Sequence, residues 1–411
     1  MINIAVLGYG TVGSGVVEVL DTNRECISQR VGEEIRVKYV LDLRDFPGDP
    51  VQNILVHNFE EIIRDEDVKI VVEVMGGIEP AYTFVKRSLL AGKSVATSNK
   101  ALVAKHGAEL LSIAKEKQIN FLFEASVGVG IPIIRPLNSS MTADEIEEIT
   151  GILNGTTNYM LTKMFYEGAG YEEVLRQAQE NGYAEKNPEA DVEGYDACRK
   201  IAILSSLISG HQVDFEDIYT EGITEITERD MEYAKQMQMT IKLLASSRRS
   251  GECLSAIVAP CLLENTHPLF GVNGVFNAIF VHGNVLGDAM FYGSGAGKLP
   301  TASAVVADVV EEAKNLNRNV MTMWKSDKLK LQDKGDTIRR FFVRITGNAE
   351  AMKTYIESIF GPVQIVMLPD VEEEFGFLTG RMTERAYEEC AAKFPNIIRM
   401  IRMQEQSGSK E

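Results

Sequence analysis

The sequence predicts an α/β protein with a doubly wound, mostly parallel sheet, then a mixed α/β region, then a small C-terminal unit. Three observations support this prediction. Apolar runs of strand length alternate with helical patterns from residue 2 to residue 125, a glycine-rich turn follows the first run, and the pattern changes after residue 136 and again after residue 337. Strands that alternate with helices are typical of a parallel sheet covered by helices.

The glycine-rich turn lies between an apolar run, residues 2–7, and a helix-like segment. This strand, turn and helix order is the setting in which GxGxxG binds a dinucleotide, because Gly8 permits the tight turn, Gly10 admits the pyrophosphate, and Gly13 lets helix and strand pack closely. Amides at the helix start then face the phosphates. We expect a Rossmann-type dinucleotide-binding domain, with a structural glycine turn as the alternative. The expected cofactor contacts are Gly8, Gly10, Thr11, Val12 and Gly13.

A second strand, residues 35–41, ends in Asp42-Leu43-Arg44. An acidic residue there would hold the ribose hydroxyls of NAD, whereas an arginine would accept the 2′-phosphate of NADP. The offset from Gly13 to Asp42 is 42 − 13 = 29 residues, longer than the usual spacing of about 20. We expect NADP, bound through Arg44, with NAD as the alternative.

Two later segments also follow strand ends. Strands are expected at 69–75, 93–99 and 119–125, and helices at 80–92 and 101–117. Ligands of doubly wound sheets lie at the carboxyl ends of the strands, which makes Ser98-Asn99-Lys100 and residues 124–130 candidates. A lysine at a helix start opposes the helix dipole, and this favours a functional reason for Lys100 over a surface lysine.

A second, mixed α/β domain is expected at residues 136–297. Within it, residues 147–165 predict a strand, a turn at Asn154-Gly155 and a helix capped by Thr156 or Thr157. A further helix is expected at 229–244, and strands at 253–263, 278–284 and 285–293. The glycine-rich segment 293–297 suggests that residues 298–315 return to the first domain, residues 1–135; a helix of the second domain is the alternative.

One charged stretch, Asn181–Lys200, runs from a loop into a helix. Breakers at Asn187-Pro188 and Gly194 exclude regular structure from its middle. From Asp196 onward apolar residues recur at helical spacing, so Lys200 lies one turn after Asp196. Such a loop brings polar groups to the edge of a core, where catalytic groups often lie, and a solvated acidic loop with a surface ion pair is the alternative. No role is assigned to Glu189, Asp191 and Glu193.

The C-terminal part is expected to be a linker followed by a compact unit. Residues 316–336 are polar and predict a loosely packed connector. Residues 337–405 then predict the order strand, helix, strand, strand, helix, strand, which is the ferredoxin-like βαββαβ pattern. The tail, residues 404–411, is expected to be disordered.

Bulk properties exclude several classes of protein. A formal charge of −17 and a pI near 4.9 argue against nucleic acid as a partner. The five cysteines are scattered without a CxxC, which argues against a disulfide framework and a zinc site. We expect neither a signal peptide nor a membrane span, and therefore a reduced, cytoplasmic setting.

Six motifs together resemble the homoserine dehydrogenase family, in the family's order and over residues 1 to about 315. They are GYGTVG (8–13), ATSNKALVAKHG (96–107), FEASVGVGIPIIRPL (123–137), GILNGTTNYML (151–161), GYAEKNPEADVEGYDACRK (182–200) and FYGSGAGKLPTASAVVADV (291–309). Residues 337–405 resemble the ACT regulatory domain of many bacterial members. No aspartate kinase precedes the motifs, so the likeness is to the monofunctional form.

The resemblance implies NAD(P)H-dependent reduction of L-aspartate 4-semialdehyde to L-homoserine, on the route to threonine, methionine and isoleucine. It further implies that residues 136–297 form the catalytic and dimerisation domain of a homodimer or homotetramer, and that an amino-acid effector binds the ACT domain. Among the site residues, Lys200 matches the family's general acid/base and Glu185 matches its substrate-binding glutamate. Asp196 matches the aspartate four residues before the catalytic lysine, and Lys100 matches the lysine of the SNK motif; both are expected to be catalytic. Ser98, Lys100 and Gly297 join the cofactor contacts.

The resemblance also implies a monovalent cation, Na or K, in the EASVGVGI segment. Its ligands would be Glu124, Val127, Val129 and Ile131, most of them through backbone carbonyls. A tight glycine turn without a metal is the alternative, since carbonyl ligands leave little trace in a sequence. Such an ion would fix the domain junction and would not polarise the aldehyde as zinc does.

The expected chemistry agrees with these residues. Hydride arriving at an aldehyde carbon leaves an alkoxide, which needs a proton or a nearby cation, and the candidates are Lys200 and Lys100. A carboxylate beside Lys200 stabilises its charged form, so Asp196 orients it. Glu185 suits the substrate amine, while the donors for its carboxylate, sought near residues 154–156, stay open. A nucleotide and amino-acid sensor, or a dehydrogenase of another amino-acid-derived aldehyde, are the competing hypotheses.

Overall fold

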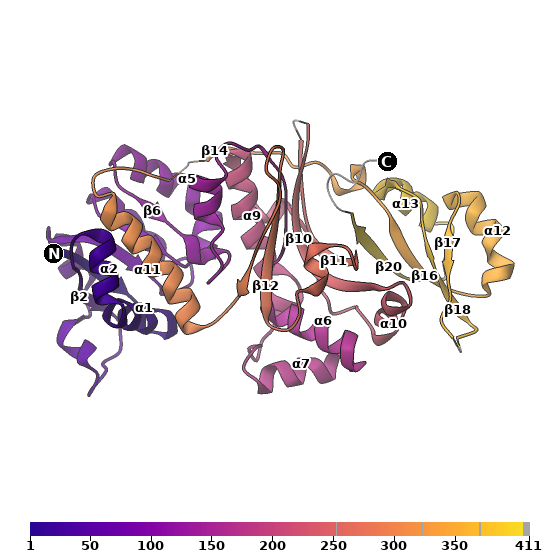
Figure 1. Ribbon diagram of the computed structural model, residues 1–411, viewed down its shortest axis with the longest axis horizontal. Coiled ribbons are helices and arrows are strands. Elements are labelled where there is room, and N and C mark those ends of the chain that lie inside the picture. Colours follow the sequence, from indigo (N-terminus) through magenta and orange to yellow (C-terminus); the bar gives the residue numbers. More distant parts are fainter. Residues whose placement is uncertain (252, 322–323, 370, 406–411) are drawn as a thin grey trace. The chain divides into compact units, whose positions relative to one another are not determined.

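The computed structural model describes residues 1–405 except 252, 322, 323 and 370 (Figure 1). The disordered tail predicted at 404–411 is wrong for Gln404, which is the last residue of a strand, and residues 406–411 lie outside the described residues. The chain forms two compact units. Unit 1 consists of Met1–Glu145, Ala202–Phe215 and Gly293–Leu329. Unit 2 consists of Ile146–Ile201, Glu216–Tyr292 and the chain from Lys330 onward.

Unit 1 contains a six-stranded parallel sheet in the order β3-β2-β1-β4-β5-β6. The strands are β1 (Ile2–Leu7), β2 (Ile35–Leu41), β3 (Leu55–Val56), β4 (Val68–Glu73), β5 (Ser94–Thr97) and β6 (Phe121–Leu122). Because the central strands β1, β4 and β5 are buried along nearly their whole length, they appear in the sequence as continuous apolar runs. The doubly wound parallel sheet is confirmed.

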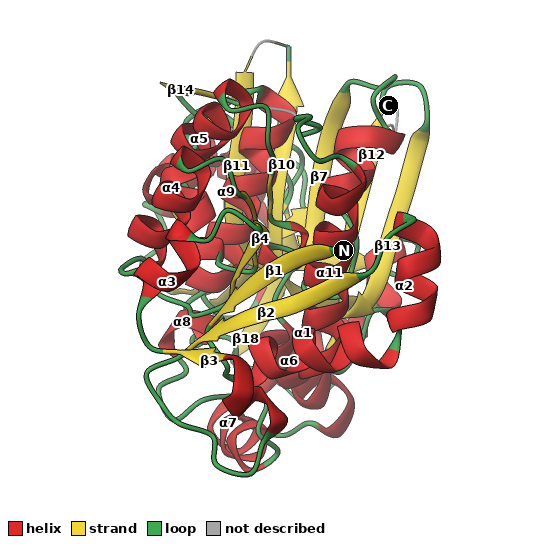
Figure 2. Ribbon diagram, turned by 90° about the vertical axis from the view of Figure 1, so that its left-hand side faces the viewer, coloured by secondary structure: helices red, strands yellow, loops and turns green. Residues whose placement is uncertain are grey.

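Helices cover both faces of this sheet. They are α1 (Thr11–Thr22), α2 (Arg24–Val31), α3 (Phe59–Arg64), α4 (Ala81–Leu90), α5 (Lys100–Glu116) and α11 (Lys298–Lys314). In Figure 2, α1, α2 and α11 lie on one side of the strands, and α3, α4 and α5 lie on the other. The late helix α11 shares a core with the start of the chain, since Val305 and Val309 pack with Ile4 and Val16. Residues 298–314 therefore belong to unit 1.

The prediction of a loosely packed connector at 316–336 is wrong for its middle. Trp324 is fully buried: its ring lies over Gly107 of α5 and its indole N–H donates to Gln212 Oε1 at 2.8 Å. The next residues form β14 (Lys325–Lys328), which pairs with β8 (His211–Gln212). The partners of Trp324 lie more than 100 residues away, so local polarity gave no sign of them.

Unit 2 contains a ten-stranded sheet in the order β13-β12-β7-β10-β11-β20-β16-β18-β17, with β9 beside β11. Its strands are β7 (Ile146–Ile152), β9 (Tyr219–Thr220), β10 (Met239–Ser250), β11 (Cys253–Glu264), β12 (Phe276–Gly283), β13 (Gly287–Ser294), β16 (Phe341–Thr346), β17 (Gln364–Val366), β18 (Glu374–Leu378) and β20 (Ile397–Gln404). A separate short pair joins β15 (Ile338–Arg339) to β19 (Met382–Thr383). This mixed sheet agrees with the predicted change of style after residue 136.

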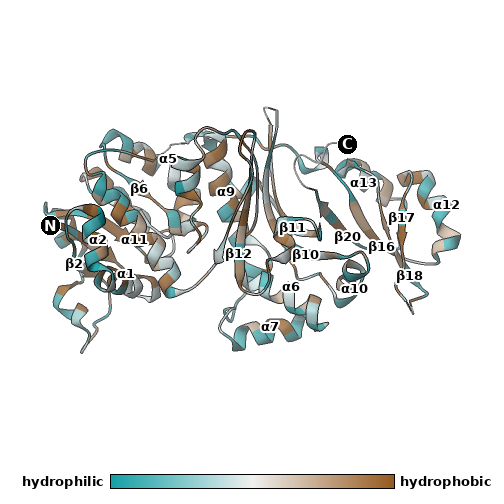
Figure 3. Ribbon diagram, viewed as in Figure 1, coloured by the Kyte–Doolittle hydropathy of each residue, from teal (hydrophilic) through white to brown (hydrophobic). Residues whose placement is uncertain are grey.

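The helices of residues 146–236 are α6 (Gly155–Glu167), α7 (Tyr171–Glu180), α8 (Glu189–Val192), α9 (Tyr195–Ser209) and α10 (Glu228–Gln236). Of α9, the residues from Ala202 onward belong to unit 1. These helices differ in hydropathy: in Figure 3, α9 is largely brown, which marks hydrophobic residues, and α7 is largely teal, which marks hydrophilic ones. In the two units together, short 3-10 helices occur at Pro50–Ile54, Glu124–Ser126, Phe215–Asp217, Pro268–Gly271 and Lys334–Asp336, and a π-helical turn occurs at Pro136–Ser140.

Two local predictions in unit 2 are wrong. The helix expected at 229–244 ends at Gln236, because the chain turns at Gln238, where φ is +58°, and continues as β10 between β7 and β11. The cap of α6 is Asn154, whose Oδ1 accepts from the Thr157 amide at 2.9 Å, and is neither Thr156 nor Thr157. Both errors come from weighing helical periodicity and hydroxyl caps without the sheet partners.

The predicted βαββαβ order is confirmed at the C-terminus, with α12 (Ala349–Phe360) and α13 (Glu384–Ala391) as its helices. Its four strands lie in the order β20-β16-β18-β17, all antiparallel, around a core of aromatic residues such as Phe341, Phe360 and Phe377. This segment is continuous with the rest of unit 2, because β20 also pairs in parallel with β11. The chain expected as a separate domain therefore shares one sheet with residues 146–292.

Candidate functional site

The glycine-rich turn has the geometry that a phosphate-binding loop needs. Gly8 has a φ of +97°, which L side chains rarely adopt. A Cβ on Gly13 would lie 1.9 Å from the carbonyl oxygen of Gly8, so only glycine lets α1 start this close to β1. Around Gly10, by contrast, the position of a Cβ is open within 4 Å, which leaves room for a ligand. Thr11 and Val12 form the first turn of α1.

A cleft of about 490 Å³ lies at the carboxyl ends of β1, β2 and β4 in unit 1. Its walls contain four of the residues singled out from the sequence: Gly8, Gly10, Asp42 and Arg44. The lining is Gly8, Gly10, Leu41, Asp42, Leu43, Arg44, His57, Phe59, Val74, Met75, Gly76, Pro80 and Phe84. Doubly wound sheets bind ligands at this edge, and a cleft of this size fits part of a dinucleotide.

Asp42 and Arg44 form one unit at the mouth of this cleft. Arg44 donates to Asp42 through its amide, Nε and Nη2, each at 3.0 Å, and the Tyr9 amide donates to Asp42 Oδ2 at 2.8 Å. Hydrogen bonds from Arg44 hold the pKa of Asp42 well below its usual value. The carboxylate is therefore committed to protein donors, while the Arg44 side chain is 63% exposed.

Ser98, Asn99 and Lys100 stand at the next strand end, as predicted. Asn99 caps α5, accepting from the Leu102 amide at 3.1 Å, and Lys100 is the first residue of that helix. The Ser98 amide donates to the carbonyl of Glu73 at 3.4 Å. Glu73, a fully buried carboxylate at the end of β4, was missed by the sequence analysis, which treated its strand as apolar.

Gly297 lies immediately before α11 in unit 1. It has a φ of +120°, and its carbonyl accepts from the Thr301 amide at 3.1 Å and from Thr301 Oγ1 at 2.6 Å. These contacts give Gly297 a capping role in α11. Its contact with a cofactor stays a prediction.

The segment predicted to hold a cation fits one only in part. Both oxygens of Glu124 accept from backbone amides, at 2.6 Å from Ile133, 2.8 Å from Ile134 and 2.8 Å from Arg135. The Glu124 carboxylate thus binds the free backbone amides at the start of the helical segment that follows it. Nearby, Val129 has a φ of +58° and Ile131 folds its carbonyl back over Gly128. Any cation would depend mainly on carbonyl oxygens, and among the described residues no group of three or more His, Cys, Asp or Glu could hold a metal ion.

The second predicted cluster lies in unit 2 and is built from side chains. Lys200 on α9 donates from Nζ to Asp196 Oδ2 at 2.8 Å and to the carbonyl of Leu153 at 2.7 Å. Both ionic side chains are almost completely buried, at 6% and 5% exposure. The i,i+4 spacing read from the sequence is thus a buried ion pair and not the alternative of a surface pair.

Asn154 links this ion pair to a residue that received no role from the sequence. Its Nδ2 donates to Asp196 Oδ2 at 3.0 Å and to Asp191 Oδ1 at 2.7 Å, while its Oδ1 caps α6. Asp191 therefore belongs to the cluster. Only the distance of 37 residues between Asp191 and Asn154 hid this contact, since both lie in motifs that were singled out.

Glu185 lies on the exposed loop between α7 and α8 in unit 2. Its carbonyl accepts from Gln179 Nε2 at 3.1 Å. Two residues earlier, the carbonyl of Tyr183 accepts from Thr156 Oγ1 at 2.6 Å, which ties this loop to the start of α6. The loop and the Asn154 cap are thus connected through one helix, while Lys100 belongs to unit 1.

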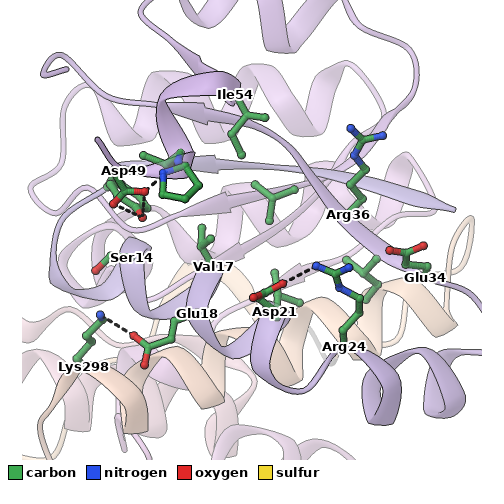
Figure 4. Close-up of a pocket in the computed structure, with 16 residues that line it drawn as sticks. Ser14, Val17, Glu18, Asp21, Arg24, Glu34, Arg36, Asp49, Ile54 and Lys298 are labelled. Carbon is green, nitrogen blue, oxygen red and sulfur yellow. Dashed lines mark hydrogen bonds and ion pairs between the residues drawn. The ribbon is translucent and has the colours of Figure 1, made fainter. Parts of the chain in front are cut away.

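A larger hollow, of about 650 Å³, lies between α1, β2 and Pro50–Ile54 (Figure 4). Two of its cations face carboxylates: Lys298 pairs with Glu18 at 2.7 Å, and Arg24 pairs with Asp21. A third cation, Arg36, lines the hollow together with Glu34 and Asp49, so the lining mixes charges of both signs. No described helix is long and apolar enough to cross a membrane.

Comparisons with known proteins match most of the chain. The family model described as Homoserine dehydrogenase matches residues 132–310, and the model described as Homoserine dehydrogenase, NAD binding domain, matches residues 8–124. A homoserine dehydrogenase of Bacillus subtilis is 43% identical over 323 residues, covering 78% of this chain and 74% of the relative. The chain belongs to the homoserine dehydrogenase family.

Further members of the homoserine dehydrogenase family match between 76% and 98% of the chain. A Helicobacter pylori relative is 40% identical over 346 residues, covering 84% of this chain and 81% of its own length. The crystal structure of a homoserine dehydrogenase from Thiobacillus denitrificans superposes with a TM-score of 0.89 at 34% identity and covers 98% of both chains. A hyperthermophilic archaeal homoserine dehydrogenase in complex with NADPH has a TM-score of 0.65 at 29% identity, over 76% of this chain and 97% of its own.

Membership of the homoserine dehydrogenase family makes this protein an oxidoreductase of amino-acid biosynthesis. The NAD binding model covers the glycine-rich turn and the cleft of unit 1, so the predicted nucleotide-binding domain is confirmed. The resemblance seen in the six sequence motifs is confirmed with it.

Proposed function

We propose that Lys200 is the general acid of L-aspartate 4-semialdehyde reduction to L-homoserine. Bound NAD(P)H supplies the hydride. The alkoxide left on the former aldehyde oxygen then takes a proton from the Lys200 ammonium. In the reverse direction the neutral Lys200 amine takes that proton back as general base. The observation that carries this proposal is the placement of Nζ by Asp196 and the Leu153 carbonyl in a buried setting.

The buried setting strengthens the effect of this ammonium on a developing negative charge. Fixed charges in a site of low dielectric stabilise such a charge more than they would in water, and they need no reorganisation during the reaction. Asp196 fixes the direction of Lys200, and a carboxylate at this distance favours the charged form of a lysine. Asn154 in turn holds Asp196, so the proton donor is positioned through two neighbours. Lys100 is proposed as a second cation at the reacting oxygen.

The substrate's own charged groups call for separate partners. An exposed carboxylate suits the substrate amine, and Glu185 is proposed for it. Asp191 is a second candidate, because the amide of Asn154 already fixes its carboxylate beside the Lys200 cluster. A Glu185→Gln variant should raise KM for the aldehyde more than it lowers kcat.

For the cofactor we propose NADP in preference to NAD. Asp42 is occupied by four protein donors, which leaves it poorly placed to take ribose hydroxyls, while the exposed Arg44 guanidinium can accept a 2′-phosphate. The archaeal relative solved with NADPH supports this proposal. The proposed cofactor contacts are Gly8, Gly10, Thr11, Val12, Gly13, Arg44, Ser98, Lys100 and Gly297.

Two ligand proposals and a location in the cell accompany the reaction. A monovalent cation would be held by carbonyls of Val127, Val129 and Ile131 beside Glu124, and replacing K or Na in the assay buffer by an organic cation tests it. An amino-acid effector would bind the ACT-like segment, which titration of the full chain with threonine tests. We also expect the protein in the cytoplasm.

A homodimer is proposed through the edge strand β13. Its outward side carries exposed Met290 and Tyr292, and Tyr292 stacks on the exposed Phe276 with ring centroids 5.2 Å apart. An apolar face on an edge strand suits a second copy of the chain. Tyr292→Glu should shift the molar mass in light scattering towards the monomer.

The decisive experiment compares initial rates with NADPH and NADH on L-aspartate 4-semialdehyde, in wild type and in Arg44→Ala. We expect activity with both cofactors, a preference for NADPH, and a KM for NADPH raised about tenfold in the variant while NADH is little affected. An unchanged preference in Arg44→Ala would contradict the role of Arg44. Absence of any turnover of this aldehyde by the wild type would contradict the proposed reaction.

A further inference from the structure

A buried carboxylate of unit 1, Glu73, lies next to the nucleotide cleft without lining it. Glu73 is the last residue of β4, and its strand is paired with β1 on one side and β5 on the other. Its side chain is completely buried. An ionised group so placed is costly unless it is well hydrogen-bonded, so its partners indicate its purpose.

These partners come from two different segments. From the loop that follows β4, the Met75 amide donates to Glu73 Oε1 at 2.8 Å. From the end of β5, Thr97 Oγ1 donates to Glu73 Oε2 at 2.6 Å. Burial raises the pKa of Glu73, while hydrogen bonds from Thr97, Met75, Gly76 and Asn99 lower it again. The carboxylate is thus the common acceptor for two chain segments.

Each of these segments carries part of the proposed cofactor site. Met75 and Gly76 line the cleft of about 490 Å³, and Gly8 of the glycine-rich turn packs against Met75. The second segment runs from Thr97 to the Asn99 cap of α5, where Lys100 begins the helix. A side chain between the two segments sets the distance between the cleft and Lys100.

Asn99 closes the same network from the other direction. Its amide donates to Thr97 Oγ1 at 2.9 Å, and its Nδ2 donates to the carbonyl of Gly77 at 2.5 Å. The chain therefore forms a ring of hydrogen bonds through Glu73, Thr97, Asn99 and residues 75–77. Within such a ring one acceptor that loses its charge weakens several contacts together.

We propose that Glu73 is a positioning residue that locks residues 75–77 of the nucleotide cleft to the Thr97–Lys100 segment. It touches neither substrate nor hydride donor, and acts through the backbone it holds. The inference rests on the proposed cofactor role of the cleft. A carboxylate that served folding alone would not need to join two segments on the ligand side of the sheet.

The test uses full-length Glu73→Gln with NADPH as the titrant. The amide keeps the size of the side chain but offers one acceptor oxygen where the carboxylate offers two, so either the Met75 amide or the Thr97 hydroxyl loses its acceptor. We expect the Kd for NADPH, followed by its fluorescence, to rise at least about tenfold. The matched control is Glu148→Gln in unit 2, also buried and also bound by a threonine hydroxyl, at 2.6 Å from Thr150. This control should lower Tm without changing the Kd for NADPH.

A second pair of variants guards against misfolding of Glu73→Gln. Thr97→Val removes the hydroxyl that bridges Glu73 and Asn99 and should also raise the Kd for NADPH, whereas Thr97→Ser keeps a hydroxyl and should restore it. Wild-type affinity in Glu73→Gln, or equal affinities in Thr97→Val and Thr97→Ser, would overturn the inference. Failure of the wild type itself to bind NADPH would overturn the cofactor proposal, and the two failures are thereby distinguished.

Discussion

The cofactor cleft of unit 1 and the lysine cluster of unit 2 are built in opposite ways. The cleft is shaped mainly by backbone, with Gly8, Gly10 and Gly13 at positions where a side chain is strained, obstructive or impossible. The cluster is shaped by side chains, with Lys200, Asp196 and Asn154 bonded to one another. The first site should therefore fail when atoms are added, and the second when atoms are removed.

The two sites also differ in how far solvent reaches their charges. The side chain of Arg44 is 63% exposed, while that of Lys200 is 6% exposed. Exposed charges are screened by salt and buried ones much less so. Raising the ionic strength should accordingly weaken NADPH binding through Arg44 more than it weakens the proton-transfer step.

Truncation of the buried lysine gives the largest expected effect. In Lys200→Ala, kcat should fall by about 10²–10⁴-fold, the range for loss of a positioned general acid, while the Kd for NADPH stays at the wild-type value. Stopped-flow rates and NADPH fluorescence measure the two quantities. Lys163→Ala, on the exposed side of α6, is the control and should behave as wild type. A Lys200→Ala variant with full turnover would refute the assignment.

Added atoms should have the next largest effect, and they separate two glycines. Gly13→Ala places a Cβ against the carbonyl of Gly8 and should lower both Tm and NADPH affinity. Gly10→Ala meets no protein atom and should keep Tm while raising the Kd for NADPH about tenfold, because the methyl group obstructs the pyrophosphate. If both variants lost stability equally, Gly10 would be structural and the comparison would break.

Two asparagine caps allow a finer contrast. Asn154→Ala and Asn99→Ala each remove the N-cap of a helix, which costs about 1 kcal/mol of stability in either case. Steady-state kinetics should then separate them: Asn154→Ala lowers kcat, since it releases Asp196, and Asn99→Ala raises KM for NADPH. Identical kinetic changes in the two variants would argue against separate tasks.

The smallest effect on turnover is expected at Lys242, a buried lysine on β10 that donates to Asn158 Oδ1, Asn273 Oδ1 and the carbonyl of Val272. Burial lowers its pKa to about 7, from 10.5. Between these pH values the unfolded chain binds the extra proton, so this lysine makes folding stability rise with pH across that window.

Urea denaturation between pH 7 and pH 10.5 measures this contribution. In Lys242→Met the free energy of unfolding should rise less steeply with pH than in wild type, by up to one proton, or about 1.4 kcal/mol per pH unit. The exposed Lys353→Met should match the wild-type slope. Equal slopes in all three proteins would mean that Lys242 stays charged in the folded state.

The sequence predicted those features that local pattern controls. Continuous apolar runs marked β1, β4 and β5 because both faces of the sheet are covered, and Gly13 was identified because only glycine permits its contact. The i,i+4 pair of Asp196 and Lys200 followed from helical spacing alone. Local pattern thus located both the nucleotide turn and the proposed proton donor.

Features that depend on contacts far apart in the chain were missed. Asp191 is held by a hydrogen bond from Asn154, and Trp324 is held by its contacts with Gly107 and Gln212. The second half of the expected helix 229–244 is a strand because it pairs with strands on both sides. Glu73 was missed because a single acidic residue in an apolar run does not reveal whether hydrogen-bond donors will surround its carboxylate in the fold. Such partners become visible only when distant segments meet.

The pairing of β20 with β11 has a consequence for how this chain can be divided. Cys261, Leu262 and Leu263 find partners in Arg402, Met403 and Gln404. A fragment truncated before residue 330 would leave this part of β11 without its strand partner, as an exposed apolar edge that can pair with other chains. Such a fragment would be prone to aggregate. The C-terminal segment therefore covers the edge of β11 and is also the candidate effector domain. A deletion or gene fusion at the connector would remove the edge protection and the candidate effector domain together.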